Sequence, residues 1–174
     1  GGAGATPGEE ALGGDTVCGL APIVLLSQGQ RLRLPRLAHW LTHRQMAHVG
    51  GFQGRTNKLV DGCYSFWQGG AFPLLHSLLS ARGEAPESGW LVNGRALMDY
   101  LLSCAQCAHG GLRDKPGKGR DFYHTCYGLS GLSVAVGAWN GGAGLPTGLT
   151  RVSLVHPIFN VVNARAEYAL EAFI

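Results

Sequence analysis

The sequence predicts an all-α fold that is built from repeated two-helix hairpins. A glycine pair, a polar loop, an apolar helix, a turn and a second helix recur three times, starting at Gly13, Gly50 and Gly110. No segment shows the alternation of apolar and polar residues that predicts a strand. A repeat of roughly 40 to 60 residues is typical of helical hairpins that bury their apolar faces against each other. We therefore expect three stacked hairpins.

The first hairpin follows a short N-terminal segment. Residues 1–12 are rich in Gly, Ala and Pro and are expected to be flexible, so that residues 13–174 form the folded part. Thr16 is expected to cap a helix, and Pro22, in the early turns, to shorten or shift it. Apolar residues at helical spacing predict the partner helix over residues 34–45.

The second and third hairpins carry longer apolar helices. A helix over residues 62–79, whose sequence is interrupted by two glycines and a proline, is expected to pair with one over residues 90–106. An apolar helix over residues 123–139, a loop over 140–150 and a final helix over 161–173 complete the repeat. The cysteines outside the candidate site are expected to be buried thiols.

The composition narrows the classes of function. The 174 residues are enough for one domain. Charged residues make up 14%, well below the usual quarter, so much of the surface is expected to be buried against a partner. The net charge of +3 is spread over several loops and gives no sign of nucleic-acid binding. Five cysteines without a signal peptide predict reduced thiols and a cytoplasmic location, and no apolar run reaches transmembrane length.

The stretch 50–68 concentrates residues that bind ligands. Arg55 and Lys58 precede an expected helix N-terminus, where anions are favoured, which suggests a phosphate site. The alternative for two isolated cations is a solvated loop.

A metal site is the second candidate in this stretch. Asp61 and Cys63 offer a carboxylate and a thiolate, which suit zinc if a histidine joins them. The alternative is an N-cap aspartate beside a buried cysteine. His124 is the best third ligand, because it opens the apolar helix of the following unit after a similar polar loop.

Two long motifs carry a family resemblance. Residues 54–68, GRTNKLVDGCYSFWQ, and residues 114–133, DKPGKGRDFYHTCYGLSGLS, resemble the β subunits of protein prenyltransferases, most closely those of the farnesyltransferases. The resemblance implies an α/α toroid of six hairpins, of which the chain would form about the C-terminal half. It also implies a transferase that works beside a helical α subunit and moves a farnesyl group from farnesyl diphosphate to the cysteine of a CaaX protein.

The resemblance assigns roles to several residues of the two motifs. Asp61, Cys63 and His124 would bind one zinc ion, and the fourth position would be left for the substrate thiolate.

Arg55, Lys58, Tyr64 and Lys115 would donate to the diphosphate, whose charge grows as the bond to the isoprenoid breaks. Asp114 would assist a magnesium ion at the diphosphate. Lys58, Tyr64 and Asp114 are thus the expected catalytic residues.

Two aromatic residues would bind the substrates. Trp67 would face the isoprenoid chain, and Tyr123 would lie near the isoprenoid and the peptide, although a packed core aromatic is the alternative for Tyr123. Leu12 and Asp15 depart from the family, which usually has His-Gly-Gly-Tyr where this chain has LGGD. These departures, together with the missing hairpins, favour an alternative, a truncated or divergent non-catalytic scaffold subunit. A geranylgeranyltransferase type I β subunit is another.

Overall fold

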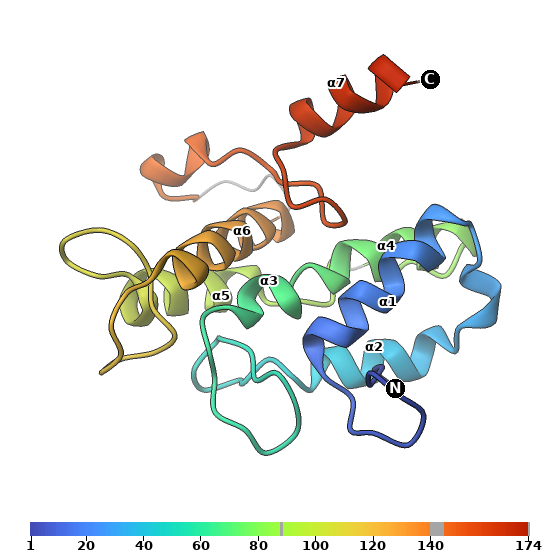
Figure 1. Cartoon of the computed structure of the whole chain (residues 1–174), viewed down its shortest axis with the longest axis horizontal. Coiled ribbons are helices and arrows are strands. Elements are labelled where there is room, and N and C mark those ends of the chain that lie inside the picture. The colour runs from blue at the N-terminus through green and yellow to red at the C-terminus, as the bar shows by residue number, and fades with distance from the viewer. Residues whose placement is uncertain (88, 140–144, 174) are drawn as a thin grey trace.

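A computed structural model describes residues 1–87, 89–139 and 145–173 of the chain. These residues form seven α-helices, short helical turns and isolated bridges, without a strand (Figure 1), so the predicted all-α class is confirmed. Within the described part, no helix combines the length and apolar character needed to cross a membrane. The helices are α1 Gly13–Leu25, α2 Leu34–Thr42, α3 Tyr64–Trp67, α4 Ala71–Ala81, α5 Gly94–Tyr100, α6 Phe122–Ala138 and α7 Asn163–Phe173.

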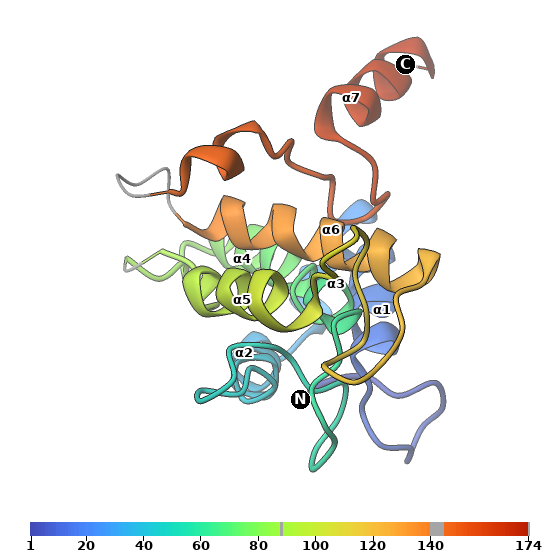
Figure 2. The same ribbon diagram turned by 90° about the vertical axis from the view of Figure 1, so that its left-hand side faces the viewer.

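The helices of the first two hairpins make their main contacts with helices of the neighbouring hairpin, and not with the partner expected within the same hairpin. Helix α4 contacts both α1 and α2, and the short helix α3 contacts α6, which also packs against α5. Figures 1 and 2 show α1, α3 with α4, and α6 as successive helices of one layer, with α2 and α5 on one side of it. The layer brings the start of α3 next to the start of α6.

The first helix begins differently from the prediction. Its N-cap is Leu12, and Thr16 is buried in the first turn, so the expectation that Thr16 caps the helix was wrong. The Thr16 hydroxyl donates to the Leu12 carbonyl at 2.8 Å and accepts from the Ala3 amide at 2.9 Å, which ties residues of the 1–12 segment to α1. Pro22 does not end the helix, which continues to Leu25. The flexibility of residues 1–12 stays a prediction.

The second hairpin is divided more than expected. The predicted 62–79 helix is two helices, α3 and α4, separated by residues 68–70. The predicted 90–106 helix starts only at Gly94, because the Asn93 side chain caps it by accepting from the Ala96 amide at 3.0 Å. It ends in a π-helical turn, Leu101–Ala105.

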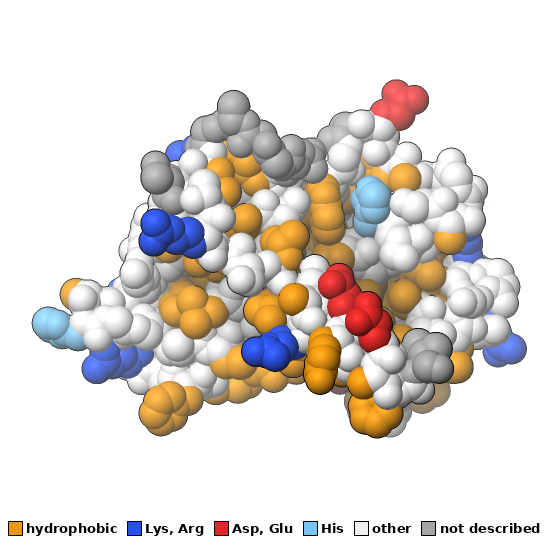
Figure 3. Space-filling view, turned by 90° about the horizontal axis from the view of Figure 1, so that it is seen from above, with side chains coloured by type: hydrophobic (Ala, Val, Ile, Leu, Met, Phe, Trp, Pro, Cys, Tyr) orange, Lys and Arg blue, Asp and Glu red, His pale blue; other side chains and the backbone are white. Residues whose placement is uncertain are grey.

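The third hairpin is open. Helix α7 forms where predicted, but it points away from the other helices (Figures 1 and 2), and of its side chains only Ala166 is buried. Part of the expected 140–150 loop lies outside the described residues, and Thr147–Arg151 form a 3-10 helix. In place of a partner helix, an extended segment lies against α6. Its Val155 amide donates to Ser133 Oγ on α6 at 2.8 Å. Figure 3 shows hydrophobic side chains exposed on this face.

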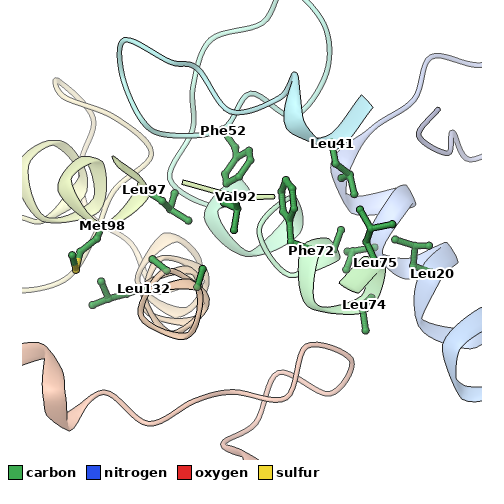
Figure 4. Close-up of a cluster of buried hydrophobic side chains, with 14 of the residues drawn as sticks. Leu20, Leu41, Phe52, Phe72, Leu74, Leu75, Val92, Leu97, Met98 and Leu132 are labelled. Atoms are coloured by element: carbon green, nitrogen blue, oxygen red, sulfur yellow. The ribbon is translucent and has the colours of Figure 1, made fainter. Parts of the chain in front are cut away.

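The core joins the helices to the loop that precedes α3. Phe52 and Phe72 are almost fully buried, with ring centroids 5.8 Å apart. Figure 4 shows them between Leu20 and Leu41 on one side and Leu97 on the other. Burial of each large side chain stabilises the fold by about 1.5 to 3 kcal/mol, and Phe52 fixes the start of the loop that leads to the candidate site.

Helices α3 and α6 approach each other unusually closely. A Cβ on Gly131 of α6 would lie 2.1 Å from the Cβ of Ser65 on α3, so only glycine permits this contact. The contact holds Cys63, directly before α3, near His124 in the first turn of α6.

Candidate metal centre

Two loops meet where α3 and α6 begin. The Gly62 amide donates to the Asp114 carbonyl at 2.7 Å, and the Tyr100 hydroxyl donates to the same carbonyl at 2.9 Å. A Cβ on Gly62 would lie 2.6 Å from the Arg113 carbonyl oxygen, so glycine is needed for this approach. The loop before α3 and the loop before α6 are therefore fixed to each other by their backbones.

Three candidate ligands converge at this junction. The residues are Asp61, Cys63 and His124, here called the metal cluster. Each offers one donor atom, and these three atoms lie within 4.8 Å of one another. His124 Nε2 is 3.2 Å from Asp61 Oδ1, which also accepts from the Cys63 amide at 2.9 Å. The imidazole of His124 thus points toward the other two residues, as a shared ion requires.

Asp121 sets the orientation of the imidazole. It is the N-cap of α6: its Oδ1 accepts from the His124 amide at 2.7 Å, and its Oδ2 lies 2.6 Å from His124 Nδ1. These hydrogen bonds with His124 lower the pKa of the Asp121 carboxyl. A carboxylate on the second ring nitrogen is the usual support of a metal-binding histidine, because it leaves Nε2 free as the ligand.

The residues fit a zinc ion. Oxygen, sulfur and nitrogen donors bind zinc at about 2.0 to 2.3 Å, and three protein ligands leave one tetrahedral position open. Burial, and then the Asp61 carboxylate, raises the pKa of the Cys63 thiol to about 12. The protein environment alone therefore keeps the thiol protonated at neutral pH, and a bound cation is what would hold it as a thiolate.

Aromatic residues cover one side of the cluster. Trp67, Tyr123 and Tyr127, here called the aromatic wall, have ring centroids 4.4 Å (Trp67–Tyr127) and 4.9 Å (Tyr123–Tyr127) apart. Trp67 Nε1 donates to the Tyr123 hydroxyl at 3.0 Å. Burial and the nearby Cys63 thiol raise the pKa of Tyr123.

Sequence reasoning missed Tyr127. Its position one turn after Tyr123 on the same helical face was the available signal. Cys18 and Cys126 are exposed, so the expectation that they are buried was wrong. Burial, followed by the nearby Cys126 and Cys18 thiols, raises the pKa of Tyr127.

The predicted diphosphate ligands are only partly assembled. Lys58 and Lys115 line the same cavity of about 300 Å³, although they come from different loops. Arg55 instead forms an exposed ion pair with Glu10 at 3.4 Å. The Lys115 ammonium donates to both carboxylate oxygens of Asp114, so that the carboxylate expected to assist magnesium is engaged by a lysine.

Tyr64 lies against the loop that carries the first two cations. Residues 53–58 are here called the cation loop. A Cβ on Gly54 would lie 2.3 Å from the Tyr64 hydroxyl oxygen, so the ring rests directly on the loop backbone. Burial raises the pKa of the Tyr64 hydroxyl. The Gly13 amide donates to the Gly54 carbonyl at 2.9 Å, which places the start of α1, next to Leu12, beside this loop.

Comparison with known proteins defines the class. Residues 1–161 match the prenyltransferase alpha-alpha toroid domain, and the chain belongs to this family. The predicted toroid is thereby confirmed as the fold class.

Individual relatives are β subunits of protein prenyltransferases. The chain is 40% identical to the protein farnesyltransferase subunit beta of Pisum sativum, over 99% of this chain and 56% of that protein. It is 37% identical to the geranylgeranyl transferase type-1 subunit beta of Arabidopsis thaliana, over 77% of this chain and 35% of that protein. A solved structure, Candida albicans protein geranylgeranyltransferase-I complexed with GGPP, superimposes with a TM-score of 0.74 at 27% identity, covering 98% of this chain and 46% of that one. The chain spans about half the length of these relatives at most, and the predicted resemblance is confirmed.

Proposed function

We propose that the chain is the zinc-bearing part of a protein farnesyltransferase β subunit. Such an enzyme transfers the farnesyl group of farnesyl diphosphate to the cysteine thiol of a C-terminal CaaX motif, together with a helical α subunit in the cytosol. The convergence of Asp61, Cys63 and His124 beside the aromatic wall is the observation that carries this proposal. The names of the farnesyltransferase relatives support it.

The metal cluster provides one half of the chemistry. A bound zinc ion would keep an incoming thiol in its nucleophilic thiolate form near neutral pH. The chain's own contribution is to hold three ligands on fixed backbones and to leave the fourth position open. Asp121 contributes by holding the His124 ring in one orientation.

The cations provide the other half. Arg55, Lys58 and the Tyr64 hydroxyl would donate to the diphosphate and offset the charge that develops on it during bond cleavage. A diphosphate would compete with Glu10 for Arg55, since that ion pair is exposed and weak. It would also compete with Asp114 for Lys115, and the released Asp114 carboxylate would be available to hold a magnesium ion, which would offset the charge of the diphosphate.

The aromatic wall fits the isoprenoid. Trp67, Tyr123 and Tyr127 present ring faces and edges next to the metal cluster, which would pack against an apolar chain and exclude water from the reacting carbon. Tyr123 is 48% exposed, so the wall retains surface for a ligand.

A geranylgeranyltransferase type I β subunit is the second candidate. The superposition with the Candida albicans enzyme and the similarity to the Arabidopsis thaliana subunit favour it. The two candidates share the metal cluster and the cations, and differ in the isoprenoid transferred.

Transfer to a CaaX peptide separates these candidates. We expect the zinc-loaded chain, in complex with an α subunit, to transfer farnesyl from farnesyl diphosphate faster than geranylgeranyl from its diphosphate. The measurement is the initial rate of peptide prenylation with each donor. Faster geranylgeranyl transfer would assign the second candidate. A folded complex that binds neither diphosphate would leave the non-catalytic scaffold.

Restoring a histidine at position 12 is expected to strengthen diphosphate binding. Leu12 lies beside the cation loop, and an imidazole there would add a hydrogen bond to a charged group. We expect Leu12→His to increase the affinity for farnesyl diphosphate about tenfold, measured by calorimetry. Leu26→His, at the far and exposed end of α1, is the matched control and should have no effect. Equal affinities for both variants and the unmodified chain would contradict the assigned place of Leu12.

A further inference from the structure

Gln68 is a fully buried polar residue that none of the assigned roles uses. It follows α3 directly, is 0% exposed, and directs its amide at the backbone of the cation loop. Its Nε2 donates to the Gln53 carbonyl at 3.3 Å and to the Gly54 carbonyl at 3.1 Å. Its Oε1 is buried without a hydrogen-bond partner in the described structure. An unpaired buried oxygen is unfavourable, so an apolar side chain would fill this space at a lower cost in free energy. We therefore attribute the presence of an amide here to the two hydrogen bonds that it donates.

The contacts of Gln68 include the start of α1. The Gly13 amide donates to the same Gly54 carbonyl, and a Cβ on Gly13 would lie 2.8 Å from the Gln68 amide carbon. Gln68 therefore closes a three-way contact between α1, the cation loop and the end of α3. Within the loop, Gln53 Oε1 accepts from the Lys58 amide at 3.3 Å, which carries the constraint on to the lysine.

The same short helix also carries Tyr64. Tyr64 and Gln68 lie one turn apart on α3 and the residue after it, and both contact Gly54, one through the ring and one through the amide. Cys63 directly precedes Tyr64. One short helical segment therefore carries Tyr64, directly follows the Cys63 ligand, and contacts the cation loop through Tyr64 and Gln68.

We propose that Gln68 is a positioning residue. It holds the cation loop at the distance from Tyr64 and the metal cluster at which Arg55 and Lys58 bind a diphosphate. This role rests on the proposed function, and it requires no contact between Gln68 and any ligand.

The test compares Gln68→Met with Ser65→Ala. Methionine keeps the length of glutamine and removes its donor. Ser65 is equally buried on α3 but faces Gly131 of α6, and its hydroxyl has no partner in the described structure, so Ser65→Ala is the matched control. The readouts are amide hydrogen exchange of peptides covering residues 53–60 and 122–138, zinc content, and calorimetric affinity for farnesyl diphosphate.

We expect Gln68→Met to speed exchange in residues 53–60 only, to retain zinc, and to weaken farnesyl diphosphate binding about tenfold or more. Gln68→Asn, whose shorter amide cannot reach both carbonyls, should fall between Gln68→Met and the unmodified chain. Unchanged exchange in the loop, or loss of protection over residues 122–138 as well, would overturn the positioning role. Absence of farnesyl diphosphate binding by the unmodified chain would overturn the proposed function instead, and the exchange data would still decide how the loop is held.

Discussion

Replacing His124 by alanine is expected to abolish stable zinc binding by the chain. The substitution removes one of three converging protein ligands and leaves Asp61 and Cys63, which cannot complete a zinc site. We expect a loss of affinity of about a hundredfold or more, together with loss of prenyl transfer by the complex. Metal analysis after dialysis against a chelator measures the first effect, and peptide prenylation measures the second.

Two further variants make this result interpretable. Asp121→Asn keeps the cap but weakens the support of the imidazole, and we expect a loss of zinc affinity of about 10- to 100-fold. His76, which stacks on Trp90, has no part in the metal cluster, so His76→Ala should retain zinc. One zinc per chain in the His124→Ala variant would refute the assigned ligand set.

Replacing Gly131 by alanine is expected to destabilise the fold by about 2 kcal/mol or more. The added methyl group would collide with the backbone and Cβ of Ser65, so α3 and α6 must separate. Gly14→Ala is the matched control, because Gly14 is also a helical glycine but has nothing within 4 Å of its missing Cβ. Alanine there should stabilise the chain by about 0.5 to 1 kcal/mol through its helix propensity.

Denaturant unfolding measures both free energies. Opposite signs for the two glycines are the expected outcome. Equal stability of Gly131→Ala and the unmodified chain would show that the close approach of α3 and α6 is not needed. Zinc affinity should fall with Gly131→Ala too, since Cys63 and His124 lie at the ends of the two helices.

Local patterns predicted most of the helices. The predicted ranges of α2, α6 and α7 agree with the structure to within a few residues. Helix α2 has apolar residues at helical spacing, and α6 is a continuous apolar segment. The break between α3 and α4 falls at Gly69 and Gly70, two of the residues that interrupt the helical pattern in the sequence. The start of α1 after Leu12 was not predictable, because Leu12 makes no side-chain cap. The direction of α7 was not predictable either, because the hydrogen bond from Val155 to Ser133 that holds the preceding segment on α6 is a tertiary contact.

The candidate site shows the same division. Asp61, Cys63 and His124 could be proposed because each lies in a long specific motif. The Arg55–Glu10 pair, the engagement of Asp114 by Lys115 and the amide of Gln68 could not, since each joins side chains or backbones through a contact that sequence spacing does not encode. Tyr127 lay between these cases, one turn from a recognised residue but without a motif role of its own.

The double engagement of Asp121 ties secondary structure to coordination. The Asp121 carboxylate both caps α6 and hydrogen-bonds to the His124 ring, so fraying of the first turn of α6 would also allow the imidazole to reorient. Conversely, a metal ion bound to the His124 imidazole would stabilise the first turn of α6. At this point of the chain, a chelating agent and a helix-melting condition act on one and the same equilibrium.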